Sequence, residues 1–257
     1  MMFNSMYYII SFFIIGLFFG SFYHVVGLRI PRKESIVYPP SHCPKCKHKL
    51  EWFELIPILS YIFLLGKCRN CKQKIPVTYP FIELITGILF AYSYYVFGVS
   101  LNLLFTLILI SGLLIIIVAD FKYMIIPDEI IIILSIVLIV FKSFMVSFDM
   151  LLNSLGSGVI AFVFMFMVKY LGDKSFKRES LGGGDVKLMF ILGFVFGIET
   201  SVMIVFISSL IAFPVAIFIL IKKKSNILPF GPFLSMAAIT LYLLQITMDD
   251  IMIFLFL

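Results

Sequence analysis

One acidic residue follows a run of three glycines in the second half of the chain. Asp185 comes directly after Gly182, Gly183 and Gly184, and it opens the apolar run 188–196. A charged group at membrane depth is costly and marks a functional site by default. Glycine lets another chain approach closely. The stretch indicates a carboxylate at a membrane surface with room for a peptide or a second acid. The alternative is a glycine cap before an ordinary helix N-terminus.

A second acid lies at the end of another apolar run. Asp120 ends the run that begins at Leu101, where a helix C-terminus disfavours negative charge. Asp128 follows Pro127, so it would lie in the first turn of the next helix, where the helix dipole favours acids. We therefore interpret Asp128 as a capping residue and Asp120 as the second functional carboxylate.

Two carboxylates that lie close together have a distinct chemistry. They cannot both ionise easily, so they share a proton and titrate as one unit. One then acts as base on a water molecule while the other donates to a carbonyl oxygen. We therefore predict that Asp120 and Asp185 hydrolyse a peptide bond as aspartic proteases do. The three histidines do not form a Ser-His-Asp or His-Glu-x-x-His pattern.

Four cysteines form two CxxC pairs and occur nowhere else. They are Cys43 with Cys46, and Cys68 with Cys71, separated by 21 residues. Each pair can give two thiolates to a tetrahedral ion, so two pairs complete a four-sulfur shell. The spacing predicts a structural zinc site that folds the loop and leaves no open position for catalysis. A redox dithiol and two disulfides are the alternatives.

The composition defines the class of protein that must position these residues. Hydrophobic residues make up 62% of the chain and charged residues 13%, whereas soluble domains carry about 25% charged residues. We predict an all-α polytopic membrane protein with about eight transmembrane helices and a small cytoplasmic zinc-binding loop domain between the first two. The predicted spans are Tyr7–Val26, Pro80–Phe97, Leu101–Val118, Glu129–Val146, Leu152–Tyr170, the short Val186–Gly197, Ser201–Ile221 and Pro232–Ile246.

The basic residues predict the orientation of the chain. All of the 20 Lys and Arg residues except Lys142 fall in alternate loops, and cytoplasmic loops carry the excess of such residues. We therefore expect the N-terminus outside and the two acids at the cytoplasmic face, with no nucleic-acid partner for the net charge of +6. The chain divides into a first helix (1–28), a zinc-binding region (29–79) and a transmembrane core (80–257).

These residues carry a resemblance to a known family. Gly182-x-Gly184-Asp185 resembles the GxGD motif of intramembrane aspartic proteases, and Asp120 with Ile126-Pro127-Asp128 resembles the partner motif of bacterial type IV prepilin peptidases. The resemblance covers nearly the whole chain. Its other elements are Gly20-Ser21-Phe22, Arg29-Ile30-Pro31, both CxxC pairs, Leu55-Ile56-Pro57-Ile58-Leu59-Ser60-Tyr61, Tyr79-Pro80 with Glu83-Leu84, and Pro229-Phe230-Gly231-Pro232-Phe233. His24 departs from the asparagine that the family usually shows.

The resemblance implies an activity at the bacterial inner membrane. Members cut the short basic leader from prepilins and pseudopilins at the cytoplasmic face, after a glycine and ahead of an apolar segment. Asp120 and Asp185 are then the catalytic pair, and Gly182, Gly184 and Lys187 belong to the active-site loop. The pilins could serve pili, protein secretion or DNA uptake. Acids that could meet the basic leader are Glu34, Glu51 and Glu54.

The resemblance also implies a second activity. Many members methylate the new N-terminus with S-adenosylmethionine as donor, and the region 29–79 that holds the zinc loop is associated with that reaction. Glu83 could take part in it, or it could be a polar contact between spans. A peptidase without methyltransferase activity is the nearest alternative. A proton- or ion-coupled transporter would place its acids in mid-span, and a non-catalytic assembly protein would not need the glycine-rich motif.

Overall fold

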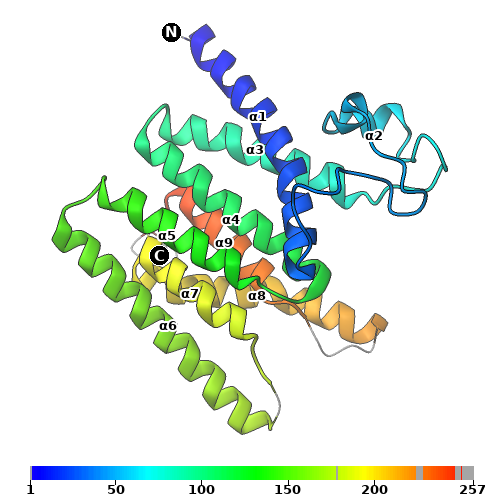
Figure 1. Cartoon of the computed structure of the whole chain (residues 1–257). Helices are drawn as coiled ribbons and strands as arrows, with labels where there is room; N and C mark the ends of the chain where they lie inside the picture. The colour runs from blue at the N-terminus through cyan, green and yellow to red at the C-terminus, as the bar shows by residue number, and fades with distance from the viewer. Residues whose placement is uncertain (1, 178, 224–227, 247–249, 251–257) are drawn as a thin grey trace. The chain divides into compact units, whose positions relative to one another are not determined.

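The computed structural model describes residues 2–177, 179–223, 228–246 and 250, and helices dominate them. Within these ranges no strand forms beyond two isolated bridges, which join His42 to Lys49 and Lys67 to Lys74. The elements (Figure 1) are α1 (Met2–Arg29), η1 (Ile30–Arg32), η2 (Trp52–Leu55), α2 (Leu59–Phe63), α3 (Thr78–Phe97), α4 (Leu101–Tyr123), α5 (Asp128–Ser143), α6 (Phe148–Phe176), α7 (Gly183–Phe196), α8 (Ile198–Lys223) and α9 (Gly231–Leu244).

Each predicted span coincides with a helix, which confirms the all-α prediction. Among the described helices, α1, α3, α4, α6 and α8 are long and apolar enough to cross a membrane. The others, α5, α7 and α9, have 16, 14 and 14 residues. At 1.5 Å per residue they reach only about 21–24 Å, short of the roughly 30 Å of a hydrocarbon core. Eight full spans therefore stay a prediction, while a multi-pass membrane protein is established.

Two helix ends differ from their predicted positions. Helix α4 continues to Tyr123 instead of ending at Asp120, so Asp120 lies in its last turn. Helix α7 begins at Gly183 instead of Val186, because the glycines adopt helical geometry. Asp185 is therefore the third residue of a helix whose N-cap is Gly182.

The chain forms two compact units, Met1–Leu107 and Ile108–Leu257. In the first unit α1 packs against α3 through glycines. A Cβ atom at Gly16 would lie 2.7 Å from the carbonyl oxygen of Thr86, and one at Gly20 would lie 2.7 Å from the Cα of Glu83. Small residues four positions apart allow such close approach of membrane helices. The Gly16-x-x-x-Gly20 spacing was the available sequence signal for this contact.

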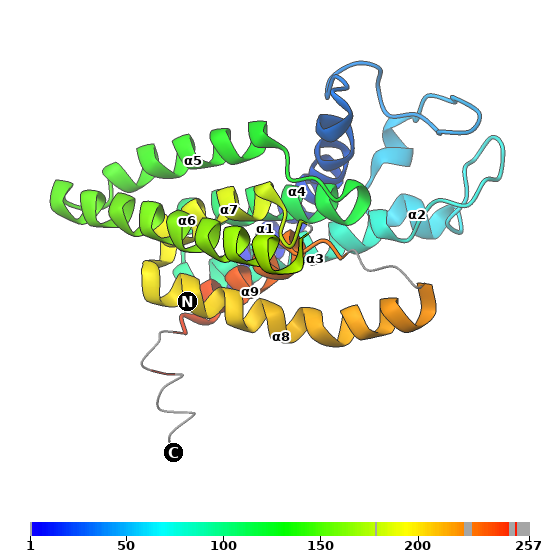
Figure 2. The ribbon, with the colours of Figure 1, turned by 90° about the horizontal axis from the view of Figure 1, so that it is seen from below.

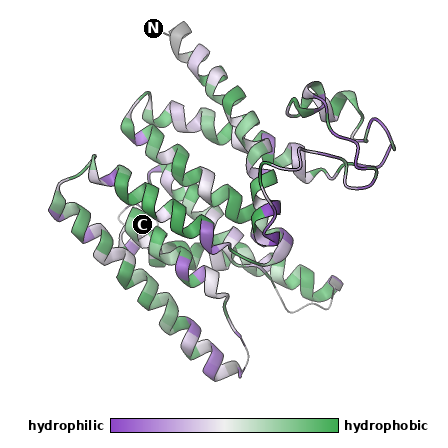
Figure 3. Ribbon diagram, viewed as in Figure 1, coloured by the Kyte–Doolittle hydropathy of each residue, from purple (hydrophilic) through white to green (hydrophobic). Residues whose placement is uncertain are grey.

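In the second unit α6 and α7 lie side by side, as Figures 1 and 2 both show. A Cβ atom at Gly193 would lie 2.5 Å from the Cβ of Ala161. Leu188, Met189 and Leu192 of α7 have no exposed surface. Helix α7 is thus enclosed by protein, which fits its short length. Figure 3 shows apolar residues covering the helices of both units and more polar residues in the loop that precedes α3.

The glycine contact between α1 and α3 predicts that a large side chain at Gly16 destabilises the first unit. Gly16→Leu should lower the free energy of unfolding of the first unit by about 2 kcal/mol, because overpacking a close contact costs 1–3 kcal/mol. Thermal unfolding of the detergent-solubilised protein measures this. Gly156→Leu is the matched control, since no described atom lies within 4 Å of a Cβ at that site. Equal stability of the two variants would refute the contact.

Candidate functional site

The second unit brings Asp120 and Asp185 together. Both side chains are buried, with 5% of each residue exposed. A Cβ atom built on Gly231 would lie 2.7 Å from Oδ2 of Asp120 and 3.3 Å from Oδ1 of Asp185. The two carboxylate oxygens are therefore at most about 6 Å apart, a range in which each charge affects ionisation of the other.

Gly231 lies beside both carboxylates, and the sequence analysis had assigned this glycine no role in the site. It is the first residue of α9, and its backbone N–H donates a hydrogen bond to Asp120. A side chain here would meet Asp120 and also Cδ1 of Ile126, at 2.7 Å. The sequence signal for it was its place in Pro229-Phe230-Gly231-Pro232-Phe233, a segment of the family resemblance just before an apolar run.

Asp185 uses its two oxygens differently. The backbone N–H of Gly182 donates to its carboxylate, and Oδ2 lies 3.0 Å from where a Cβ of Gly182 would be. Oδ1 is buried and has no hydrogen-bond partner among the described residues. The predicted alternative was an acid that merely starts a helix. It explains the hydrogen bond of one oxygen but not the burial of the unpaired Oδ1. The other oxygen faces the neighbourhood of Gly231 and Asp120.

The loop before Asp185 is fixed by side chains of α6. Lys169 donates from Nζ to the carbonyl oxygen of Leu181 at 2.6 Å. Oδ1 of Asp173 accepts from the backbone N–H of Ser180 at 2.6 Å and from its hydroxyl at 2.8 Å. Lys169 and Asp173 are also an ion pair, at 3.1 Å. These positioning residues were not predicted, and their four-residue spacing was the only available signal.

The two inner glycines of the motif have different surroundings. A Cβ atom at Gly184 would lie 2.7 Å from Cβ of Ile126, so this glycine lets the segment after α4 pack directly on the start of α7. At Gly183 no described atom lies within 4 Å of such a Cβ atom. Space for an approaching peptide therefore exists beside Gly183, whereas the space beside Gly184 is filled.

Asp128 lies in the first turn of α5, as predicted, but its side chain does not cap the helix. The N-cap of α5 is Pro127, and no side-chain cap bond forms there in the described structure. Oδ1 of Asp128 instead accepts a hydrogen bond from Nζ of Lys187, at 2.6 Å. The positive charge of Lys187 neutralises this exposed acid, and the contact ties α5 to α7 next to Asp185.

The four cysteines of the first unit form one cluster. Their sulfur atoms all lie within 4.8 Å of one another. Sγ of Cys43 is 3.7 Å from that of Cys71, and Sγ of Cys46 is 3.9 Å from that of Cys68. In a tetrahedron with metal–sulfur bonds of 2.3 Å, sulfurs are about 3.8 Å apart. The cluster therefore has the dimensions to hold a metal ion.

The two CxxC turns are near copies of each other. The N–H of Cys43 donates to the carbonyl of His48 at 2.9 Å, and that of Cys68 to the carbonyl of Gln73 at 2.8 Å. Lys47 and Lys72, which follow the two turns, both have left-handed backbones, with φ of 58° and 57°. The backbone N–H of Cys46 lowers the pKa of the Cys43 thiol to about 6, which favours the thiolate that metals bind.

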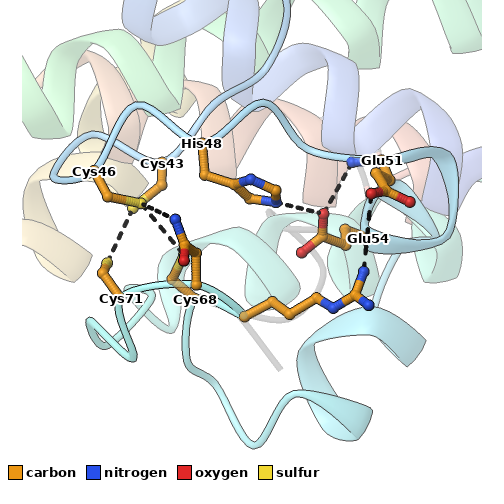
Figure 4. A network of polar contacts seen from close by, with 9 residues as sticks. Cys43, Cys46, His48, Glu51, Glu54, Cys68 and Cys71 are labelled. Atoms are coloured by element: carbon orange, nitrogen blue, oxygen red, sulfur yellow. Dashed lines mark hydrogen bonds and ion pairs between the residues drawn. The ribbon is translucent and has the colours of Figure 1, made fainter.

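The acids that we expected to meet a basic leader are engaged within the first unit (Figure 4). Oε2 of Glu54 accepts from the backbone N–H of Glu51 at 2.9 Å and lies 3.2 Å from Nε2 of His48. Glu54 is buried, and its contact with a basic leader stays a prediction. Glu51 is exposed and lies 3.9 Å from Arg69, while Glu34 pairs with Arg32 at 2.9 Å.

Glu83 is buried and joins α3 to the loop between the two CxxC pairs. Its Oε2 accepts the backbone N–H of Ile58 at 2.7 Å, and the hydroxyl of Ser21 on α1 also bonds to its carboxylate. Glu83 therefore makes structural polar contacts, and its part in methyl transfer stays a prediction. One turn earlier on α3, the ring of Tyr79 lies 3.9 Å from the ring of the buried His24.

The comparisons with known proteins cover both units. Residues 14–97 match the bacterial peptidase A24 N-terminal domain, and residues 107–217 match the type IV leader peptidase family. The prepilin leader peptidase/N-methyltransferase of Bacillus subtilis is 38% identical over 240 residues, covering 90% of this chain and 92% of the relative. Its namesake in Vibrio cholerae is 32% identical over 225 residues, covering 80% and 84%. No solved structure gives a significant match.

The fold and the site define a multi-pass, all-α membrane protein with two buried carboxylates side by side and a separate cysteine cluster. The extent of the matches also determines the family of the chain. The chain belongs to the type IV leader peptidase family, and the predicted resemblance is confirmed.

The cysteine geometry makes a prediction about metal content. The purified protein should contain about one zinc ion per chain, as a closed four-sulfur site would hold. Cys43→Ser with Cys46→Ser should remove it, because two sulfurs cannot retain the ion. Elemental analysis by mass spectrometry measures the metal. As a control, Ser41→Ala changes a neighbour outside the cluster and should leave the metal in place. A metal-free parent protein would exclude the site.

Proposed function

We propose that this enzyme removes the leader peptide from type IV prepilins or pseudopilins by a two-aspartate mechanism, at the cytoplasmic face of the bacterial inner membrane. It then methylates the new N-terminus with S-adenosylmethionine. The observation that carries the first reaction is the convergence of Asp120 and Asp185 on Gly231. The names of the relatives, prepilin leader peptidase/N-methyltransferase, support both reactions.

The hydrolytic step follows from the two buried acids. One carboxylate is ionised and takes a proton from a water molecule, whose oxygen attacks the carbonyl carbon of the scissile bond. The other is protonated and gives its proton to the carbonyl oxygen, which forms a tetrahedral intermediate. When the intermediate collapses, the carbon–nitrogen bond breaks and the departing amine takes a proton from the pair. The N–H of Gly231 holds Asp120 in place for this exchange.

The substrate is an apolar helix with a basic leader. Asp120 lies in the last turn of α4 and Asp185 in the first turn of α7, so both lie at helix ends. The distribution of Lys and Arg favours the cytoplasmic side for both and an outside N-terminus. The open space beside Gly183 would admit the extended chain between leader and helix. In this proposal residues 80–257 form the peptidase core, with Gly182, Gly184 and Lys187 in its loop.

The second reaction is assigned to the zinc-loop region, residues 29–79. Cys43, Cys46, Cys68 and Cys71 would hold a zinc ion with a complete shell of sulfur ligands, so the ion would fold the loop and take no part in bond making. S-adenosylmethionine, when bound, supplies an electrophilic methyl group to the new amino terminus. The chain's own contribution is to bind the donor and to present the amine to it.

The peptidase proposal predicts which acids are indispensable. Asp120→Asn and Asp185→Asn should each lower leader removal from a co-expressed prepilin at least about 100-fold, because the proton transfers of acid–base catalysis are lost. Immunoblots and mass spectrometry of the pilin measure the cleavage. Glu129→Gln is the matched control, since Glu129 is exposed on the same side and should keep normal cleavage. Normal processing by either aspartate variant would overturn the proposal.

The same mass spectra report the second reaction. A mature pilin from cells with the parent enzyme should carry the added mass of one methyl group at its N-terminus. Correct cleavage without that mass would show that the enzyme is a peptidase and would refute its methyltransferase activity.

The contact at Gly231 predicts a loss of activity without a change of any acid. Gly231→Ala would place a Cβ atom 2.7 Å from Oδ2 of Asp120 and displace this carboxylate. Leader cleavage should fall about 100-fold, as displacements of about 1 Å can cause. Thermal unfolding shows whether the variant is folded. Gly156→Ala, at an open helix position, should cleave normally; unchanged cleavage by Gly231→Ala would show that the pair does not depend on this contact.

A further inference from the structure

A large cavity lies within the first unit, apart from the aspartate pair in the second. Its volume is about 740 Å³, and residues from α1, α2, α3 and both CxxC turns line it. Sites for small molecules in proteins have volumes of about 300–1,000 Å³. The cavity could therefore take a ligand the size of a nucleoside with a side chain. No residue of the proposed hydrolytic reaction lines it.

Two buried acids line this cavity, Glu54 and Glu83. Each uses one oxygen to accept a backbone N–H, from Glu51 at 2.9 Å and from Ile58 at 2.7 Å. The second oxygen of Glu54, Oε1, is buried and has no partner in the described part of the chain. Figure 4 shows it pointing away from the contacts with His48 and Glu51. An unpaired buried carboxylate oxygen is costly, so a cationic group is the expected partner.

Other residues around the cavity suit a ligand that also carries an anionic group and a flat ring. Arg29 and the exposed Lys74 line it together with the rings of Tyr38 and Tyr79. Arginine and lysine bind carboxylates, and aromatic rings stack on planar heterocycles. A cation in the interior, a carboxylate and a heterocycle are the three parts of S-adenosylmethionine.

We infer that this cavity binds the methyl donor, with its positively charged sulfonium facing Glu54 and Glu83. The inference rests on the proposed methyltransferase function and gives that function a site. Glu54 then has two tasks, since one oxygen closes the turn at Glu51 and the other attracts the cation. Glu83 joins α3 to the loop at Ile58, so the donor would lie between the membrane helices and the zinc loop of the same unit.

The charge of the sulfonium provides a test that does not depend on turnover. S-adenosylmethionine and S-adenosylhomocysteine differ by one methyl group and one positive charge. Isothermal titration calorimetry on the purified, zinc-loaded protein should show about tenfold tighter binding of the charged compound, since buried charge pairs discriminate strongly. Equal affinity of the parent protein for both compounds would overturn the inference without any variant.

Variants then show which residues cause the preference for S-adenosylmethionine over S-adenosylhomocysteine. Glu54→Gln and Glu83→Gln keep the acceptor for the backbone N–H but remove the charge, and each should reduce the tenfold preference to near unity. Glu51→Gln is the matched control: this acid is exposed and outside the lining, so the preference should stay. Zinc content and leader cleavage verify that each variant is folded. If both glutamine variants keep the parent preference, the site is elsewhere.

Failure of the inference can be told from failure of the proposed function. A parent protein that methylates pilins and binds the donor, with a preference insensitive to Glu54 and Glu83, refutes only this site. A parent protein that binds neither compound and leaves pilins unmethylated refutes the methyltransferase activity itself, and the inference with it. If a basic leader peptide, without the pilin helix, displaces the donor, the cavity binds the leader. This result would also overturn the inference.

Discussion

The structure of the second unit depends on the burial of two acids in an apolar protein. Carboxylates lose their hydration there and must be compensated by hydrogen bonds or by a shared proton. Backbone groups meet part of this requirement, since Gly231 donates to Asp120 and Gly182 donates to Asp185, and Lys169 also interacts electrostatically with Asp185. The unpartnered Oδ1 of Asp185 is the part of this arrangement left for a water molecule or a substrate.

The neighbours of the pair follow from that requirement. The N–H of Gly231 can reach Asp120 only where no side chain intervenes, and Gly184 must be small for Ile126 to close over the start of α7. Lys169 and Asp173 form hydrogen bonds with the loop at Leu181 and Ser180. Lys187 is directed to Asp128 instead of to the acids. The positive charges near the pair therefore hold backbone segments in place.

The first unit uses buried acids in a similar way. Glu54 and Glu83 each accept a backbone N–H of the zinc loop. Ile58, the partner of Glu83, has φ of 60° and ψ of −51°, and the N–H of Leu59 donates to the carbonyl of Pro57 at 2.6 Å. Such a tight turn with positive φ is rare and strained in a β-branched residue. The hydrogen bond from Ile58 to Glu83 helps to hold this turn. Glu83 therefore helps to set the position of the loop relative to α3.

The sequence predicted what depends on local pattern. Apolar runs located the helices, the CxxC spacing located the cysteine cluster, and acids at the ends of apolar runs singled out Asp120 and Asp185. Apart from the aspartate pair and the cysteine cluster, contacts between distant segments leave no local pattern and could not be predicted. Asp128 pairs with Lys187 instead of capping α5, and the place of Gly231 depends on how α9 packs. The burial of Glu54 could not be predicted either, because a capping contact three residues away leaves no pattern in the sequence.

The most direct measurement is a structure of the purified enzyme with a substrate-like inhibitor. The inhibitor would be a leader–pilin junction peptide in which a hydroxyl-bearing carbon replaces the scissile carbonyl. The hydroxyl should lie within hydrogen-bond distance of both Asp120 and Asp185, next to Gly231, with the peptide backbone over Gly183. A hydroxyl bound away from the two carboxylates, or in contact with only one of them, would contradict hydrolysis by the pair.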